Sequence, residues 1–382
     1  MKKAVLMFGM LFFTTSGLLA QEFCQTPSFG NQEKLKERKG VPDYSSYSFC
    51  VTLYVHVIRK DDGSDGQTVG GVNSALQYLD DAFTPHQIFF DSTSGINYID
   101  DTALFNSPTS IMANTTYDHS DGVDMYLFDN DSNHPVTGGG YGLTEGIGVS
   151  SKFMVTGSFM GIPFYPIAQS FVVAHEMGHV LDVYHTRHGT VTELGDPNQC
   201  PEFVNGTNGT TCGDYCADTP ADPGINFNID LSTCTWLGSG VDQNGDPYDP
   251  DELNIMGQTH PACMEYFTTD QKKRMKSAMV AISHLADASV FSNSVLYPCG
   301  LKSQDITVYP NPSDKILYLQ PGKDNVSNYS FTLYNEYGVK VNSGNNILGQ
   351  RSIDTSRLPQ GIYFLHIKEN NEVTIKQIRI KH

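Results

Sequence analysis

The segment from Val172 to His185 constrains the fold of this chain more than any other, because it fixes the relative positions of three histidines. It reads VVAHEMGHVLDVYH. The pattern predicts a helix over 167–184 that places His175 and His179 on one face, one turn apart. His185 follows six residues after His179, too far to continue that face. The chain must therefore turn after the helix to bring the third imidazole beside the first two.

Three imidazoles held together in this way are a typical ligand set for catalytic zinc, since they leave the fourth position to water. Glu176 projects beside His175 and His179, where it can take a proton from that water. A methionine in Asn254-Ile-Met-Gly257 can pack beneath the ligands. We therefore predict zinc at His175, His179 and His185, with Glu176 as the general base.

The extended histidine motif followed by a methionine turn resembles the metzincin proteases. The flanking sequence is similar to the pappalysin family, which includes ulilysin, over about residues 50–290. The similarity is carried by four blocks: His185-Thr186, GDYCADTPAD at 213–222, NIM at 254–256 and CMEYFT at 263–268. It implies an α+β fold with a two-lobed metzincin catalytic domain, built from a mixed sheet and an active-site helix. It also implies a zinc endopeptidase acting on protein or peptide substrates, with Met256 as the Met-turn residue.

Two residues depart from the family pattern. Asp182 stands where metzincins carry the glycine that permits the turn after the helix. Asp is among the few side chains that tolerate positive φ, so we expect the turn to survive. Gln258 stands where relatives usually carry tyrosine, and its amide is a candidate donor to the oxyanion.

The N-terminus has the pattern of an export signal. Lys2 and Lys3 precede an apolar run, and small residues lead to Ala20, so residues 1–20 are predicted to be a signal peptide. The alternative is a membrane anchor, but the run is shorter than the ~20 residues that span a bilayer. No transmembrane segment is expected later in the chain. The protein is thus expected to be secreted, extracellular or at the cell surface, with residues 21–49 as a prosegment or lead-in.

The chain has eight cysteines, and an even number behind a signal peptide favours disulfides. For Cys24 two interpretations stay open: a disulfide, which the even number favours, or a thiolate that caps the zinc in a latent form. Cys212 and Cys216 have a spacing seen in metal sites, but without a second close pair a disulfide is the favoured interpretation.

Calcium is a second candidate cofactor, with a structural role. The loop 242–251 alternates oxygen-bearing side chains around a glycine, which suits calcium and equally suits an acidic loop without an ion. The family resemblance adds Asp214, Asp218 and Thr219 as further candidate ligands. His188 is expected to be an exposed loop residue. The net charge of −18 argues against nucleic acid as a partner.

The C-terminal part differs in composition from the rest. Residues 301–382 contain ten Lys and Arg against seven Asp and Glu, and no cysteine. Short alternating strands predict a small all-β sandwich over 304–382, leaving 50–300 as the protease domain. Its motifs resemble type IX secretion sorting domains, which implies the type IX secretion machinery as a partner. They are YPNPS at 309–313, LYNEYG at 333–338 and DTSRLPQGIYF at 354–364. The alternative is an accessory sandwich that binds carbohydrate or protein.

Two other functions remain open at this point. One is a catalytically weak surface-binding protein on a metzincin scaffold, which the presence of Glu176 and all three histidines disfavours. The other is a zinc hydrolase that cleaves a non-peptide amide.

Overall fold

The computed structural model describes residues 23–28, 44–129, 140–159, 165–191, 199–292, 299, 306–321, 329–336, 339–347, 351–369 and 372–382. The predicted signal peptide lies outside these residues, as does most of the predicted lead-in. In the part of the chain that is described, no helix is long and apolar enough to span a membrane.

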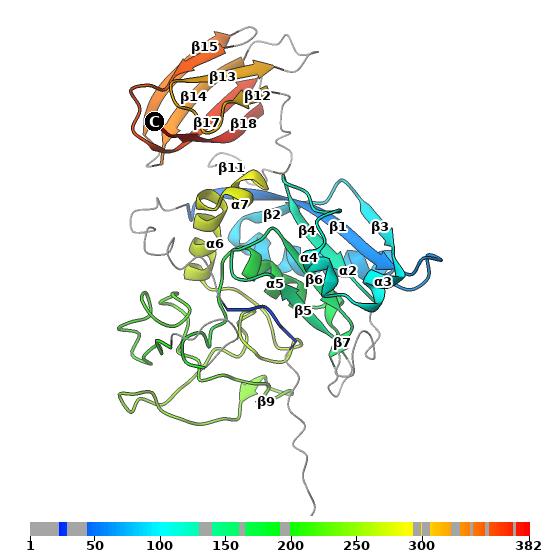
Figure 1. Cartoon of the computed structure of the whole chain (residues 1–382). Helices are drawn as coiled ribbons and strands as arrows, with labels where there is room; N and C mark the ends of the chain where they lie inside the picture. Colours follow the sequence, from blue (N-terminus) through cyan, green and yellow to red (C-terminus); the bar gives the residue numbers. More distant parts are fainter. Residues whose placement is uncertain are drawn as a thin grey trace, which may run out of the picture.

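A mixed sheet forms the centre of the first part of the chain (Figure 1). Its main path runs in the order β11-β1-β4-β6-β5, and β2 and β3 also pair with β1. β1 lies parallel to β4, and β4 lies parallel to β6, whereas β5 and β11 are antiparallel to their neighbours. The strands are β1 (Ser48–Arg59), β2 (Ile88–Asp91), β3 (Ile96–Asp100), β4 (Val123–Leu127), β5 (Tyr141–Thr144), β6 (Lys152–Thr156) and β11 (Ser289–Ser292).

Both faces of the sheet are covered, because successive side chains of a strand point to opposite faces. Met125 of β4 belongs to the main core with helices α2 and α5, whereas its neighbour Tyr126 packs in a second cluster with Leu104 and Ile111. The helices and short elements of this region are α2 (Val69–Phe83), η1 (Thr84–His86), α3 (Thr102–Asn106), α4 (Ser110–Ala113), β7 (Ser158–Phe159), β8 (Tyr165–Pro166), η2 (Ile167–Gln169) and α5 (Val172–Val180).

The segment between α5 and α6 has little regular structure. Among its described residues the strands are β9 (Ile229–Asp230) and β10 (Thr235–Trp236). Two disulfides, Cys200–Cys212 and Cys234–Cys263, close loops in it, as expected for a long segment that cannot form a large core of its own. A third disulfide joins Cys50 to Cys299.

Two predicted helices have different limits in the structure. The helix predicted over 167–184 is divided: η2 ends before Ser170, which is extended, and α5 ends at Val180 because Asp182 has a φ of 74°. The sequence Thr268-Thr-Asp-Gln271 predicts a capping box that opens a helix running to about His284, but the helix ends earlier. It is α6 (Thr269–Ala281), and extended Ile282 separates it from α7 (Ser283–Asp287).

The C-terminal part is all β and forms two sheets (Figure 1). One has the order β12-β13-β16 and the other β15-β14-β17-β18. Leu317, Leu333 and Ile367 are among the side chains packed in their shared core. The strands are β12 (Ile306–Tyr309), β13 (Ile316–Pro321), β14 (Tyr329–Asn335), β15 (Lys340–Ile347), β16 (Arg351–Asp354), β17 (Gly361–Glu369) and β18 (Glu372–Ile380). The predicted α+β class with a C-terminal all-β region is confirmed.

Candidate active site

The structure brings the three predicted histidines together. His179 Nε2 lies 3.1 Å from His175 Nε2 and 3.1 Å from His185 Nε2. His175 and His179 come from one face of α5, and all three residues are buried. The turn after α5 carries His185 back, as the sequence predicted.

The arrangement of ring nitrogens fits a cation. His175 Nδ1 lies 2.6 Å from the carbonyl oxygen of Ile255, and His179 Nδ1 lies 2.8 Å from that of Val183. A carbonyl can only accept, so both Nδ1 atoms carry a proton and the neutral rings turn Nε2 lone pairs toward one point. Lone pairs about 3 Å apart repel unless a cation lies between them. Three imidazoles are a ligand set typical of zinc, so the residues present fit this metal.

The turn after α5 depends on an ion pair. Asp182 has positive φ, as predicted for an aspartate in a glycine position. Its carboxylate lies 2.9 Å from Arg274 Nη2, and Arg274 Nε also donates to the Asp182 carbonyl. Arg274 lies over the ring of Tyr184. The α6 arginine therefore holds the turn that positions His185.

The segment around Met256 lies against α5. A Cβ added to Gly178 would come within 2.7 Å of Met256 Sδ, so the sulfur packs directly on the helix between the two histidines. Met256 N donates to Asn254 Oδ1, and Thr186 N donates to the Met256 carbonyl. Met256 is fully buried. These contacts place Met256 against α5, and its role as the Met-turn residue stays a prediction.

Glu176 is buried beside the histidines. Thr26 Oγ1 donates to its Oε2 at 2.8 Å, and Oε1 has no hydrogen-bond partner among the described residues. Burial raises the pKa of the Glu176 carboxyl to about 8, and the hydrogen bonds from Thr26 and Cys24 act in the opposite direction. Gly142 of β5 permits this approach, since a Cβ there would come within 2.4 Å of Glu176 Cγ. The carboxyl is thus placed to exchange a proton.

Residues 23–28 cross the site as a short strap (the dark blue segment below α5 in Figure 1). Gly142 N donates to the Phe23 carbonyl, and Gln25 N donates to the Gly142 carbonyl, so the strap pairs in parallel with β5. Cys24 Sγ lies 3.4 Å from His179 Nε2. Cys24 and the three histidines form one group whose ligand atoms all lie within 4.8 Å of one another.

The disulfide interpretation of Cys24 and Cys216 is wrong. Both thiols are free and buried, whereas Cys212 pairs with Cys200. Cys24 lies beside the three histidines and not beside another cysteine, so it cannot form a disulfide in this structure. The spacing of Cys212 and Cys216 did not indicate that Cys216 is a free thiol, because sequence alone does not determine disulfide connectivity.

Gln258 is buried next to Arg187. Arg187 Nη1 donates to Gln258 Oε1, while Gln258 Nε2 has no hydrogen-bond partner among the described residues. An amide N–H left unpaired in a buried position is costly. The amide therefore keeps a donor available for a ligand.

The predicted calcium ligands are only partly assembled. Asp214 Oδ1 accepts from Cys216 N and Thr219 Oγ1, but Asp218 Oδ2 instead accepts from the backbone of Asp270, at the start of α6. Burial, and then the charge of Asp214, raises the pKa of Glu202 to about 8. Glu202, which sequence reasoning missed, is thus close enough to act on Asp214 electrostatically.

The structure also describes the loop 242–251, a candidate calcium site, and His188, which was expected to be exposed. In the loop 242–251, the Asp242 carboxylate accepts hydrogen bonds from the backbone of Val204, Asn244 and Asp246. The expectation that His188 is exposed is wrong: it is buried against Tyr184.

Sequence reasoning also missed Thr26, Arg187 and Arg274. Thr26 and Arg274 lie far from the histidine motif in sequence, and Arg187, two residues after His185, is not part of a ligand pattern. Gly142 belongs to the glycine-rich stretch 138–148, whose composition predicts either a close backbone approach near the active site or an ordinary surface loop. The structure places Gly142 directly against Glu176.

Comparison with known proteins gives matches to both parts of the chain. The family described as "Secretion system C-terminal sorting domain" matches residues 307–381. A protein of Colletotrichum graminicola (strain M1.001 / M2 / FGSC 10212) named "Extracellular metalloprotease" is 27% identical over 289 residues, covering 70% of this chain and 93% of that protein.

A solved structure of PorZ, a bacterial surface component of the type IX secretion system of Porphyromonas gingivalis, is also similar. It has 13% sequence identity and a TM-score of 0.19, and the match covers 25% of this chain and 14% of PorZ.

The chain therefore carries a C-terminal type IX sorting domain, which implies an interaction with the secretion machinery. It is a secreted or cell-surface protein, and it has a distant extracellular metalloprotease homologue.

Proposed function

We propose that this protein is a secreted zinc endopeptidase of the metzincin type, similar to the pappalysins. The observation that carries the proposal is the convergence of His175, His179 and His185 Nε2 atoms beside the buried carboxyl of Glu176. The similarity to a protein named extracellular metalloprotease supports the same reaction class. We further propose residues 50–300 as the protease domain and 304–382 as the sorting domain.

In this proposal each residue has a defined role. His175, His179 and His185 hold zinc, which when bound supplies Lewis-acid activation of a water molecule and of the scissile carbonyl. Glu176 takes the proton from the attacking water and passes it to the leaving amine. Gln258 Nε2 is the proposed donor to the oxyanion. Met256 and Ile255 position α5 and the His175 ring.

The strap suggests how the enzyme is kept latent. Cys24 lies next to His179, where a thiolate would take the position that water needs, and Thr26 holds Glu176. The strap also uses the backbone groups of Gly142 at the β5 edge, which would otherwise pair with an extended substrate. We propose that residues 21–49 form a prosegment and that activation removes the strap.

Calcium remains a proposal as a structural ion. Glu202 Oε2 and Asp214 Oδ2 are buried and have no hydrogen-bond partner among the described residues. Two buried carboxylates near each other repel unless protons or a cation compensate them, and calcium prefers oxygen ligands of this kind.

The proposal is tested by casein cleavage after removal of the strap. The activated wild type should cleave casein, lose activity on chelation and regain it with zinc, whereas Glu176→Gln should be inactive although it binds zinc. A binding protein on a metzincin scaffold would leave casein intact in every case. A hydrolase of non-peptide amides would act on small amides alone, and either result would contradict the proposal.

A further inference from the structure

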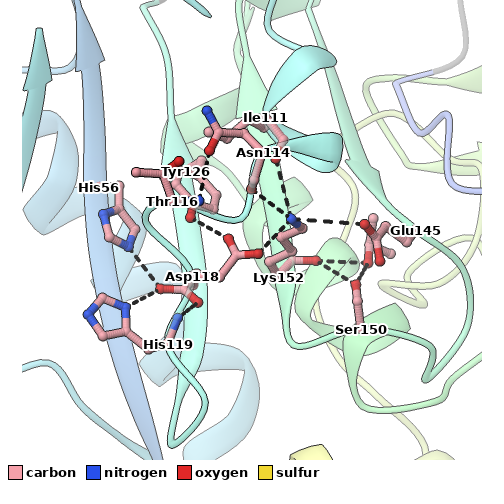
Figure 2. Close-up of polar contacts among 12 residues, drawn as sticks. His56, Ile111, Asn114, Thr116, Asp118, His119, Tyr126, Glu145, Ser150 and Lys152 are labelled. Atoms are coloured by element: carbon pink, nitrogen blue, oxygen red, sulfur yellow. Dashed lines mark hydrogen bonds and ion pairs between the residues drawn. The ribbon is translucent and has the colours of Figure 1, made fainter. Parts of the chain in front are cut away.

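The structure contains a second convergence of metal-ligating atoms, away from α5. His56 of β1, Asp124 of β4 and His119 in the loop before β4 place their side chains at one point. Figure 2 shows the His56 and His119 rings beside each other. His56 Nε2 lies 2.9 Å from Asp124 Oδ1, and His119 Nδ1 lies 2.7 Å from the same oxygen. Among the described residues only this group and the one at α5 bring three or more such atoms within 4.8 Å.

We propose that His56, His119 and Asp124 form a second transition-metal site, which binds one divalent ion such as zinc and ties the 115–122 loop to the sheet. Two imidazoles and one carboxylate are a known protein ligand set for zinc, with water in the remaining position. The site shares no residue with the α5 histidines, so it does not depend on the proposed protease function.

Both imidazoles are held in place by aromatic neighbours. The Tyr54 ring stacks on His119 with a centroid distance of 3.5 Å and an interplanar angle of 8°. The Tyr126 ring stacks on His56 at 4.5 Å and 17°. Rings fixed before an ion arrives lose little conformational freedom when it binds.

Hydrogen bonds behind the ligands complete the arrangement. His119 N donates to Asp124 Oδ2 at 2.8 Å, which leaves Oδ1 directed at the two rings. His56 Nδ1 lies 2.9 Å from Nδ2 of Asn97, so in this orientation the amide nitrogen donates to the ring. An amide turned to present its oxygen would accept the Nδ1 proton and leave the Nε2 lone pair to a metal.

The charge balance favours a cation at this point. The Asp124 side chain is 1% exposed, and a buried carboxylate is destabilised unless hydrogen bonds and a positive charge compensate it. Lys152, which is opposite Asp124 in the β4–β6 register, turns instead to Asp118, 2.8 Å away (Figure 2). Solvent reaches the group through His119, whose side chain is 38% exposed, so an ion can enter and keep a water ligand.

The competing arrangement is a triad without metal, in which one imidazole carries an extra proton and both rings donate to Asp124. The substitution His119→Asn separates the two. Its amide N–H can replace the Nδ1 donor, so the hydrogen-bonded triad would survive, but an imidazole ligand would be lost. His382→Asn is the matched control, because His382 Nδ1 also lies 3.0 Å from a carboxylate, that of Asp314, without a second histidine.

The test is the number of zinc ions bound by the purified full chain, stripped by chelation, dialysed against zinc and analysed by mass spectrometry. Wild type and His382→Asn should hold two ions, and His119→Asn one. The double variant His175→Ala/His179→Ala should also hold one. If His119→Asn holds as many ions as wild type, the proposal is wrong.

A second measurement does not depend on the folding of His119→Asn. Copper(II) added to the His175→Ala/His179→Ala variant should give an electron paramagnetic resonance spectrum with splitting from two nitrogen ligands. Absence of that splitting would overturn the site even if the α5 histidines bind zinc as proposed.

Discussion

Asp182 shows how a single unusual residue is compensated by a distant one. The residue keeps the positive φ of the glycine it replaces, and Arg274 from α6 pairs with its carboxylate. The sequence predicted that aspartate could adopt this conformation. It gave no sign of the arginine, since ninety-odd residues separate the two and no motif joins them.

Removing Arg274 should therefore destabilise the protein strongly. Arg274→Gln leaves the Asp182 carboxylate buried without its cation, a change that typically costs about 3–5 kcal/mol. Asp182→Gly combined with Arg274→Gln should be milder than the two single effects added together. Thermal unfolding of the four proteins measures this coupling, and strictly additive effects would show that the pair does not support the turn.

Cys24 carries the proposed latency. Cys24→Ala in the full chain should raise casein cleavage before any processing, by roughly tenfold if the thiolate contributes about 1.4 kcal/mol to closing the site. Cys216→Ala is the matched control, because Cys216 is also free and buried but is not in the group around the histidines. Equal casein cleavage by the two variants would show that the Cys24 thiol does not keep the enzyme latent.

At the scale of helices and strands, features set by neighbouring residues could be predicted from the sequence, whereas pairing between distant segments could not. The capping box at Thr268 and Gln271 is present as predicted, because both residues act within one turn of the chain. Alternating apolar residues predict strands at the positions of β12, β13, β14, β17 and β18. They do not indicate β15, which contains three asparagines and a glycine, or β16, whose four residues include one apolar side chain. The parallel pairing of the strap with β5 joins residues more than a hundred positions apart, which no local pattern reports.

The capping box gives a direct test at this scale. Thr268 Oγ1 accepts from Gln271 N, and the Gln271 side chain accepts from Thr268 N. Thr268→Ala should lower the free energy of unfolding by about 1 kcal/mol. The neighbouring Thr269→Ala is the control, since Thr269 is exposed and is not the N-cap. Equal unfolding midpoints for the two variants would contradict the cap.

For the whole molecule, the sorting domain also packs on the first part of the chain. Phe364 lies 5.5 Å from Phe291 and 6.4 Å from Tyr44, measured between ring centroids, and Gln377 Nε2 donates to the Val280 carbonyl. Composition indicated a boundary near residue 300 but carried no information about these contacts, because they join residues far apart in the sequence.

Deleting the residues after Gly300 should separate secretion from catalysis. The truncated chain keeps Cys299 and every proposed zinc ligand, so turnover of the purified, activated enzyme should be close to normal. Exposure of Phe291 and Tyr44 should lower stability by roughly 2–3 kcal/mol, from the apolar area uncovered. In the native host the truncated protein should stay in the periplasm. Normal secretion of the truncated protein would contradict the sorting role. Loss of turnover in a folded sample would mean that residues after 300 belong to the catalytic domain.

The central claim is that water, activated beside Glu176, is added across a peptide bond. The most direct measurement is mass spectrometry of a peptide digested by the activated enzyme in heavy-oxygen water. The wild type should give fragments with heavy oxygen at each new carboxyl terminus, and Glu176→Gln should give no fragments. Equal cleavage by the two enzymes, or no cleavage by the zinc-loaded wild type, would contradict the account.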